Sequence, residues 1–276
     1  MVYIELNVKM DPENPLIEIV MAELGELGFE SFVDTTDGML AYIPATLFNE
    51  QLISEMQIIK ENPSLFSYTF QLMEDKNWNE VWESNYEAVI VNNRCGIRAP
   101  FHPENKEVEY DLVIMPKMSF GTAHHETTSN MIEFLLEEDI QNRSVLDMGC
   151  GTSVLAILAA KRGAKNVVAI DNDEWAYNNS LENIVMNNEP GISVLLGDAG
   201  LLTGMHFDII IANINRNILL NDIHTYADAL NNKGVLLMSG FYTQDIEIIT
   251  EECAKYNINL ERSIIKNNWV ALRFIK

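Results

Sequence analysis

The sequence predicts an α/β protein in which a small α+β ferredoxin-like domain precedes a larger, doubly wound domain. Three observations lead to this expectation. The chain has 276 residues, which exceeds the usual size of one domain. From residue 124 onward, strand-like and helical patterns alternate regularly, as in a mostly parallel sheet with helices on both faces. A turn with two glycines, residues 147–151, joins one of these strands to the next helix.

Residues 1–74 follow the order strand, helix, strand, strand, helix, strand, which is that of ferredoxin-like modules. Apolar and polar residues alternate from Ile4 to Met10, and this period of two predicts a half-buried strand. Asn14 and Pro15 suit the N-cap and the first position of the helix that follows. The second helix is expected to carry Leu52, Met56 and Ile59 on its apolar face.

We expect three segments in the chain. Residues 1–74 form the small domain, residues 75–90 a polar linker, and residues 91–276 the larger domain. Trp78 and Trp82 lie four positions apart in the linker, which predicts a short helix with one packed face.

The larger domain is expected to bind its ligand beyond the carboxyl ends of its strands, near the switch point of the sheet. Helices are expected near residues 124–138, 153–162, 173–187, 216–231 and 243–256. Strands are expected at 144–149, 166–171, 192–197, 207–213 and 234–239, followed by the closing runs "LERSIIK" and "WVALRFIK".

The composition is strongly acidic, with 18 basic and 41 acidic residues and a formal net charge of -23. Such a field repels phosphate backbones and attracts basic partners, which argues against DNA or RNA as the main substrate. An acidic surface that only keeps the protein soluble is the alternative.

Cysteine usage and hydropathy indicate a reducing, cytoplasmic setting. Cys95, Cys150 and Cys253 are widely separated and form no C-x-x-C pair, so the spacing predicts neither a disulfide framework nor a zinc site. The first residues lack a basic leader with an apolar core, and no apolar run approaches the roughly 20 residues that span a bilayer.

The turn "DMGCG", residues 147–151, is the main functional signal. Its glycines allow the backbone to come close to a ligand. A dinucleotide-binding turn reads G-x-G-x-x-G, but Val154 occupies the third glycine position. Asp147 precedes the first glycine, and a carboxylate there suits a ligand with a cationic amino-acid end better than a pyrophosphate. These features favour S-adenosylmethionine over NAD, with a generic strand-turn-helix corner as the alternative.

Three polar residues follow neighbouring strands. Asp171 ends the strand "NVVAI", where its carboxylate can accept hydrogen bonds from both ribose hydroxyls of such a donor. Asn213 ends "FDIIIAN"; in amino-group methyltransferases the corresponding Asn lies beside the sulfonium and the incoming nitrogen, but an Asn at a strand end can equally form a turn. Asp198 is placed to bind an adenine amino group, and a turn is again the alternative.

The segment "MPKMSFGTAHHETT", residues 115–128, matches the F-G-T-x-x-H-x-T-T segment of ribosomal protein L11 methyltransferases of the PrmA type. The chain resembles that family over essentially its whole length. The resemblance implies a seven-stranded, Rossmann-like methyltransferase domain that uses S-adenosylmethionine, preceded by a substrate-recognition domain. The cofactor-binding residues that it implies are Thr128, Gly149, Gly151, Asp171 and Asn213. Phe120, Gly121, Thr122, His125 and Thr127 match the same segment without an assigned contact.

The chain departs from the family pattern at two places. Residues that are usually Gly, Gly, Thr and Pro are Lys117, Ala123, His124 and Glu126 here, which predicts a less mobile loop. Asn215, Arg216, Asn217 and Ile218 stand where members commonly have Leu-Ala-x-Pro, so the substrate-facing edge of the site is expected to differ. Adjacent histidines do not share a helix face, so no metal is expected, and His125 is interpreted as a hydrogen-bonding group that fixes the loop.

The resemblance implies a protein N-methyltransferase that acts on lysine and/or N-terminal amines of a basic large-subunit ribosomal protein. We predict no catalytic residue, because an activated sulfonium mainly requires orientation. A methyltransferase acting on another protein or a small amine is one alternative, and a nicotinamide-dependent oxidoreductase is an alternative of another class. Methylation of a nucleic-acid base would ordinarily show Asn-Pro-Pro-Tyr where this chain has "NINR" at residues 213–216.

Overall fold

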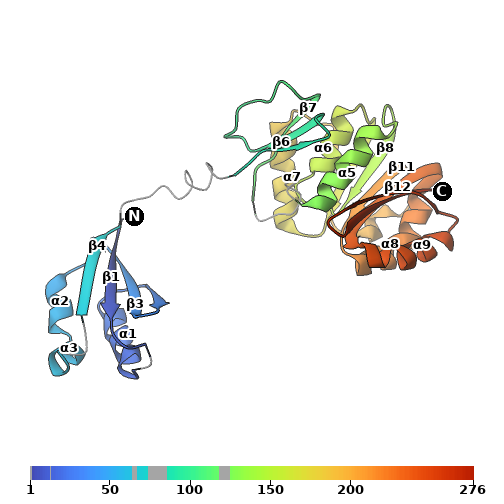
Figure 1. Cartoon of the computed structure of the whole chain (residues 1–276). Coiled ribbons are helices and arrows are strands. Elements are labelled where there is room, and N and C mark those ends of the chain that lie inside the picture. The colour runs from blue at the N-terminus through green and yellow to red at the C-terminus, as the bar shows by residue number, and fades with distance from the viewer. Residues whose placement is uncertain (1, 13, 64–66, 74–85, 118–124) are drawn as a thin grey trace. The chain divides into compact units, whose positions relative to one another are not determined.

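Two compact units make up the chain, residues 1–85 and residues 86–276. The linker tryptophans Trp78 and Trp82 lie outside the part of the chain that the structure describes. The computed structural model describes residues 2–12, 14–63, 67–73, 86–117 and 125–276 (Figure 1).

A four-stranded antiparallel sheet in the order β2-β3-β1-β4 forms the first unit. Side chains along a strand point alternately to its two faces, and Ile4, Leu6 and Val8 of β1 point to the same face. They pack with Val20 and Leu24 of α1 in the core of this unit. The elements are β1 (Tyr3–Lys9), α1 (Leu16–Glu26), β2 (Ser31–Thr35), β3 (Gly38–Pro44), α2 (Glu50–Glu55), α3 (Gln57–Glu61) and β4 (Ser67–Leu72).

The expected cap of the first helix is present, and the expected second helix was wrong in detail. Asn14 Oδ1 accepts a hydrogen bond from the Leu16 amide at 3.0 Å, and Pro15, just before the first residue of α1, has helical angles of φ -57° and ψ -20°. The second helix is interrupted at Met56, whose ψ of 134° is extended. Met56 is buried in the core, and this packing separates α2 from α3. Leu52 is exposed, and its neighbour Ile53 is buried in its place.

A seven-stranded mixed sheet in the order β10-β9-β8-β11-β12-β14-β13 dominates the second unit. The first five strands in this order, β10, β9, β8, β11 and β12, are parallel. Strand β14 pairs antiparallel with both β12 and β13. This arrangement confirms the predicted α/β class. The elements that precede this sheet are β5 (Val89–Val91), β6 (Cys95–Arg98), β7 (Tyr110–Val113) and α5 (Glu126–Glu137). Those of the sheet and its helices are β8 (Ser144–Met148), α6 (Val154–Lys161), β9 (Asn166–Asp171), α7 (Glu174–Met186), β10 (Ile192–Leu196), η1 (Ala199–Leu202), β11 (Phe207–Asn213), α8 (Arg216–Ala229), β12 (Leu230–Tyr242), η2 (Thr243–Asp245), α9 (Ile246–Ala254), β13 (Asn259–Lys266) and β14 (Trp269–Ile275).

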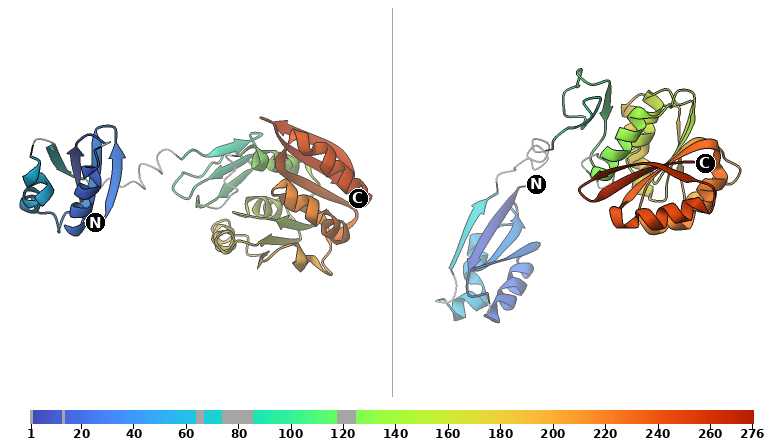
Figure 2. Two further views of the ribbon diagram at one scale, coloured as in Figure 1. Left: turned by 90° about the horizontal axis from the view of Figure 1, so that it is seen from below. Right: turned by 45° about the vertical axis from the view of Figure 1, so that its right-hand side comes forward.

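Helices cover both faces of this sheet, with α5, α6 and α7 on one face and α8 and α9 on the other (Figures 1 and 2). Neighbouring residues of one strand therefore enter different cores. Val145 of β8 packs in the core that contains α5 and α6, and Leu146 packs in the core that contains α8 and α9. Burial on both faces explains why the central strands read as continuous apolar runs.

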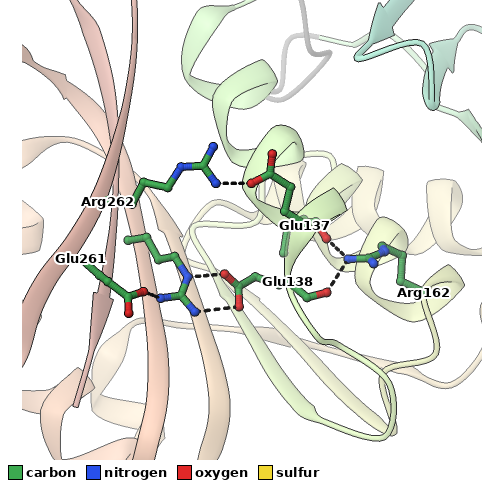
Figure 3. Close-up of polar contacts among 7 residues, drawn as sticks. Glu137, Glu138, Arg162, Glu261 and Arg262 are labelled. Carbon is green, nitrogen blue, oxygen red and sulfur yellow. Dashed lines mark hydrogen bonds and ion pairs between the residues drawn. The ribbon is translucent and has the colours of Figure 1, made fainter.

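Ion pairs fasten the C-terminal end of α5 to the β13–β14 hairpin (Figure 3). Arg273 pairs with Glu138 and Glu261, and Arg262 pairs with Glu137. The side chains of Arg273 and Glu138 are only 16% and 10% exposed, so water screens this pair less than an ordinary surface pair. Through these contacts the hairpin fixes the position of α5, whose N-terminal end reaches the carboxyl edge of the sheet.

Candidate functional site

A cavity of about 920 Å³ lies at the carboxyl edge of the second unit's sheet. It spans the ends of β8, β9 and β11. From β8 the chain adds strands first on one side (β9, β10) and then on the other (β11, β12), and doubly wound sheets bind ligands at such a switch point. The five residues that the family resemblance implies for cofactor binding all lie on its wall. They are Thr128, Gly149, Gly151, Asp171 and Asn213.

The turn after β8 is tight because its glycines adopt left-handed backbone angles. The φ angle is 69° at Gly149 and 55° at Gly151. The amides of Gly149 and Cys150 both donate to the carbonyl oxygen of Ile170, at 2.8 and 3.1 Å, and tie the turn to β9. A Cβ atom on Gly149 would lie 2.1 Å from Cγ2 of Ile214. Glycine is therefore required here for close packing against the segment after β11 as well as for its φ angle.

Asp171 links the glycine turn to the start of α7. Its Oδ2 accepts a hydrogen bond from the Gly151 amide at 2.9 Å, and its Oδ1 accepts one from the Asp173 amide at 3.0 Å. Two backbone bonds thus hold the carboxylate in place. Because each carboxylate oxygen can accept a second hydrogen bond, Asp171 keeps acceptor capacity for a ligand in the cavity.

Asp147 lies beneath the turn and not on the cavity wall. Its side chain is 1% exposed, and its Oδ2 accepts a hydrogen bond from the Ala156 amide of α6 at 3.0 Å. Burial raises the pKa of Asp147 to about 7, against the lowering effect of that hydrogen bond and with a smaller contribution from the charge of Asp171. The structure thus corrects the expectation that this carboxylate faces the ammonium end of a ligand, because it supports α6 instead.

Small polar side chains support the same turn from α7. Ser180 Oγ donates to the Gly151 carbonyl oxygen at 2.9 Å and accepts a hydrogen bond from Ser153 Oγ at 2.8 Å. Cys150 Sγ lies 3.4 Å from Ser180 Oγ. Burial raises the pKa of the Cys150 thiol to about 12, so the thiol remains protonated and acts as a small packing group.

The start of α5 forms the next part of the wall. His125 is the N-cap residue; its Nδ1 accepts a hydrogen bond from the Thr127 amide at 3.3 Å and lies 2.9 Å from Thr127 Oγ1. Asn213 Nδ2 donates to Thr128 Oγ1 at 3.4 Å, which joins two candidate residues that are 85 positions apart in the chain. His125 therefore orders the helix start that carries Thr128 to the end of β11.

Other wall residues were missed from the sequence. Trp269 begins β14, Gly240 has a φ of 96° in β12, and Trp175 lies in the first turn of α7 with 79% of its surface exposed. A positive φ at both Asn267 and Asn268 forms the hairpin turn before Trp269, and this Asn-Asn pair is the signal that could have placed Trp269 at a sheet end. No sequence motif marks Gly240 or Trp175.

Further residues named from the sequence take different places. Lys117 lies on the wall and pairs with Glu182 of α7. Asp198 does not lie on the wall. Its Oδ1 accepts a hydrogen bond from the Gly200 amide at 2.9 Å and caps η1, so the alternative of a turn residue holds. Glu126 Oε1 accepts a hydrogen bond from Asn267 Nδ2 at 2.9 Å. Phe120, Gly121, Thr122, Ala123 and His124 lie outside the described residues.

The described ranges contain neither a metal-binding cluster nor a membrane-spanning helix. No group of three or more His, Cys, Asp or Glu side chains there could hold a metal ion. None of the helices in these ranges has both the length and the apolar character needed to cross a bilayer.

The chain is similar to one family over nearly its full length. The family model described as "Ribosomal protein L11 methyltransferase (PrmA)" matches residues 16–276. A protein of that name from Phocaeicola vulgatus is 48% identical over 100% of this chain and 99% of its own. A protein of the same name from Bacteroides fragilis is 45% identical over 100% of both chains, and one from Chlorobaculum parvum is 33% identical over 98% of this chain and 95% of its own.

A solved structure supports the same likeness. It is that of a ribosomal protein L11 methylase from Lactobacillus delbrueckii subsp. bulgaricus, which is 25% identical and has a TM-score of 0.63. The match covers 68% of this chain and 98% of that chain. The second unit accordingly has an α/β methyltransferase fold with a mixed central sheet.

Proposed function

Because the chain belongs to the ribosomal protein L11 methyltransferase family, we propose that it methylates ribosomal protein L11 with S-adenosylmethionine as the methyl donor. The acceptors are lysine side chains and/or the N-terminal amine. One observation carries this proposal: Asp171 and Asn213, at the ends of two parallel strands, flank the glycine turn on the wall of one cavity.

The wall residues fit S-adenosylmethionine. Asp171 is held by two backbone hydrogen bonds and still has lone pairs that would accept bonds from the ribose hydroxyls. Gly149 and Gly151 would allow the amino-acid end to approach the backbone. Thr128 and Asn213, which contact each other, would hold the part of the donor nearest the methyl group.

The main task of the protein in this reaction is to orient the acceptor. When bound, S-adenosylmethionine would supply an activated methyl group. A neutral amine nitrogen would form the new N–C bond as the C–S bond breaks with its electron pair left on sulfur, and the product would stay a protonated ammonium at pH 7. A lysine with a pKa near 10.4 must first lose a proton, which costs about 5 kcal/mol at pH 7. Ile214, Ile218 and Trp269 on the wall would lower that cost by removing water from the ammonium group.

The first unit would act as the substrate-recognition domain. Its strand order β2-β3-β1-β4 and its pattern of one helix after β1 and two after β3 support the ferredoxin-like assignment for residues 1–74, with residues 75–90 as the linker. Residues 1–74 contain 13 acidic and two basic side chains, a charge that suits a basic ribosomal protein and not a nucleic acid. Such a substrate places the reaction in the cytoplasm.

The proposal can be tested by incubating the protein with methyl-labelled S-adenosylmethionine and a set of purified ribosomal proteins. We expect the label on amines of L11, located by mass spectrometry. Asp171→Ala should weaken donor binding about 100-fold, because it removes two charge-assisted hydrogen bonds to the ribose.

The matched control is Asp139→Ala, which removes a carboxylate that is 80% exposed and lies before β8 at the other edge of the sheet. This variant should bind the donor as the wild type does. Label on ribosomal proteins other than L11, or unchanged donor affinity in folded Asp171→Ala, would refute the substrate or the site, respectively.

A further inference from the structure

With the proposed function, the cavity divides into a donor end and an acceptor end along the carboxyl edge of the sheet. Asp171 ends β9, Gly149 follows β8, Asn213 ends β11, and beyond them Tyr242 ends β12 opposite Trp269, the first residue of antiparallel β14. Neighbouring strands lie about 4.8 Å apart, so β9 to β11 spans roughly 10 Å and β11 to β14 roughly 10 Å more. A donor held between Asp171 and Asn213 occupies the first span. In-line transfer then requires the acceptor amine to come from the second span.

Three rings form what we call the aromatic wall of the acceptor end: His125, Tyr242 and Trp269. The Trp269 ring centroid lies 4.5 Å from that of His125 in an edge arrangement and 4.1 Å from that of Tyr242. His125 and Trp269 line the cavity, and Tyr242 lies behind Trp269 with 41% of its surface exposed. Aromatic faces attract ammonium groups and pack well against alkyl chains, so this wall suits a lysine side chain.

An ion pair from outside the cavity wall fixes the strand end that carries Tyr242. Asp245 Oδ2 accepts a hydrogen bond from the Tyr242 amide at 3.2 Å, and Asp245 Oδ1 lies 2.8 Å from Arg216 Nη1. The Asp245 side chain is only 8% exposed. The hairpin tip is held to the same point, because the Thr243 amide donates to the Asn268 carbonyl oxygen at 3.1 Å.

Arg216 keeps its place through these contacts and not through its helix. It is the first residue of α8, where the helix dipole disfavours a positive charge. Its guanidinium is held on one side by Asp245 and on the other by Asn217 Oδ1, at 3.2 Å from Nε and 3.0 Å from Nη2. Arg216 therefore connects the start of α8, where the N-cap residue Asn215 and the helix residue Ile218 line the cavity, to the end of β12.

We propose that Arg216 and Asp245 are positioning residues for the acceptor amine: their ion pair holds Tyr242 against Trp269 and thereby fixes the aromatic wall at the acceptor end, an assignment that rests on the proposed function. Neither residue contacts the donor end. Loss of the pair lets the aromatic wall move relative to Asn213, so that the amine is held less well while the donor is held as before.

The test compares Arg216→Met with the wild type in three measurements. The KM for purified ribosomal protein L11 should rise about tenfold, as expected when a positioning contact is lost. The dissociation constant for S-adenosylmethionine, measured by calorimetry, should stay the same. The near-ultraviolet circular dichroism of the Tyr242–Trp269 pair should weaken in the absence of any substrate. Arg216→Lys, which retains the charge beside Asp245, should recover most of the L11 affinity.

The matched control is Arg143→Met. Arg143 has 42% of its side chain exposed against 43% for Arg216, and its partner Asp139 is 3.7 Å away and solvent-exposed. This variant should match the wild type in all three measurements. Asp245→Asn gives a second test from the other side of the pair, with the same expected rise in the L11 KM.

Two results would overturn the assignment. One is an unchanged KM for L11 in both Arg216→Met and Asp245→Asn, and the other is an equal loss of donor affinity, which would indicate general destabilisation. Failure of the wild type to methylate L11 would instead refute the proposed function. In that case the circular dichroism still reports whether Arg216 orders the Tyr242–Trp269 pair.

Discussion

The two ends of the cavity are built in different ways. At the donor end, the turn after β8 and the end of β9 are joined by backbone hydrogen bonds, and Asp171 binds two backbone amides. At the acceptor end, side chains from the N-cap of α5 and from α8, β12, η2 and β14 meet through ring contacts and an ion pair. Main-chain geometry thus fixes the first end, and side-chain contacts between distant segments fix the second. Substitutions should therefore tune acceptor choice more readily than donor binding.

The largest change in unfolding free energy is expected from substitution of Asp147, the buried carboxylate beneath the donor end. Burial raises the pKa of Asp147 from 3.8 to about 7, so the folded protein keeps a proton there that the unfolded chain releases above about pH 4. The folded state therefore loses stability as pH rises from about 4 to 7. Asp147→Asn, which does not titrate and can still accept the Ala156 hydrogen bond, should gain about 2–3 kcal/mol of unfolding free energy over the wild type between pH 5 and pH 8.

Urea unfolding of both proteins at the two pH values measures this difference. Asp139→Asn alters an exposed carboxylate and should follow the wild-type pH dependence. If the wild type and Asp147→Asn show parallel pH dependences, burial does not raise the pKa of Asp147, and its ionisation does not lower the stability of the folded protein.

A smaller change in unfolding free energy is expected from substitutions at Gly149 and Ile214, where the two ends of the cavity are in contact. Gly149→Ala adds a Cβ atom 2.1 Å from Ile214 Cγ2 at a φ of 69°, which should lower the unfolding free energy by about 2 kcal/mol through overpacking and backbone strain. Ile214→Ala in the same chain removes that Cγ2 atom. In the Ile214→Ala background, Gly149→Ala should therefore cost about 1 kcal/mol less than it does in the wild type. The remaining cost is the backbone strain.

Gly204→Ala separates these two contributions. Gly204 has a φ of 78° and no atom within 4 Å of the added Cβ, so its variant measures the backbone strain alone. A Gly149→Ala variant that is no less stable than Gly204→Ala, or a double variant without recovery, would show that Ile214 does not link the donor end to the acceptor end.

The same contrast explains which parts of the site could be predicted from the sequence. Gly149, Gly151 and Asp171 lie within one strand-turn-helix-strand segment, where residue spacing alone determines which groups meet. Thr128 was found only through a resemblance to a family, and the position of Asn213 at a strand end left a turn as the alternative, because their contact joins two elements that are distant in the chain. Helices and strands of the second unit were predicted to within a few residues, since burial on both faces makes the central strands uniformly apolar.

Tyr242, Trp269 and Asp245 of the acceptor end were not predicted, because their roles depend on tertiary packing. Trp269 reads as an ordinary strand residue until the antiparallel pairing of β12 and β14 brings it opposite Tyr242. For Asp147 the opposite error occurred. Its position in the motif suggested a ligand contact, but the first turn of α6 covers it. The break at Met56 in the first unit has the same origin, since core packing overrides the helical pattern of its neighbours.

The smallest effect concerns how the acceptor end receives its substrate. A basic protein approaching the acidic residues of the first unit should associate more slowly as salt screens the attraction, because the Debye length falls from about 10 Å at 0.1 M to about 3 Å at 1 M. We expect the KM for L11 to rise roughly threefold between 0.1 and 0.5 M salt while the S-adenosylmethionine dissociation constant changes little.

Two double variants test which acidic residues attract the substrate. The first combines Glu18→Gln and Glu26→Gln on exposed positions of α1, and the second combines Glu247→Gln and Glu251→Gln on exposed positions of α9. The first should reduce the salt dependence of the L11 KM more than the second. Equal salt dependence of the L11 KM in both double variants would mean that the total charge of the chain steers the substrate, and not the first unit.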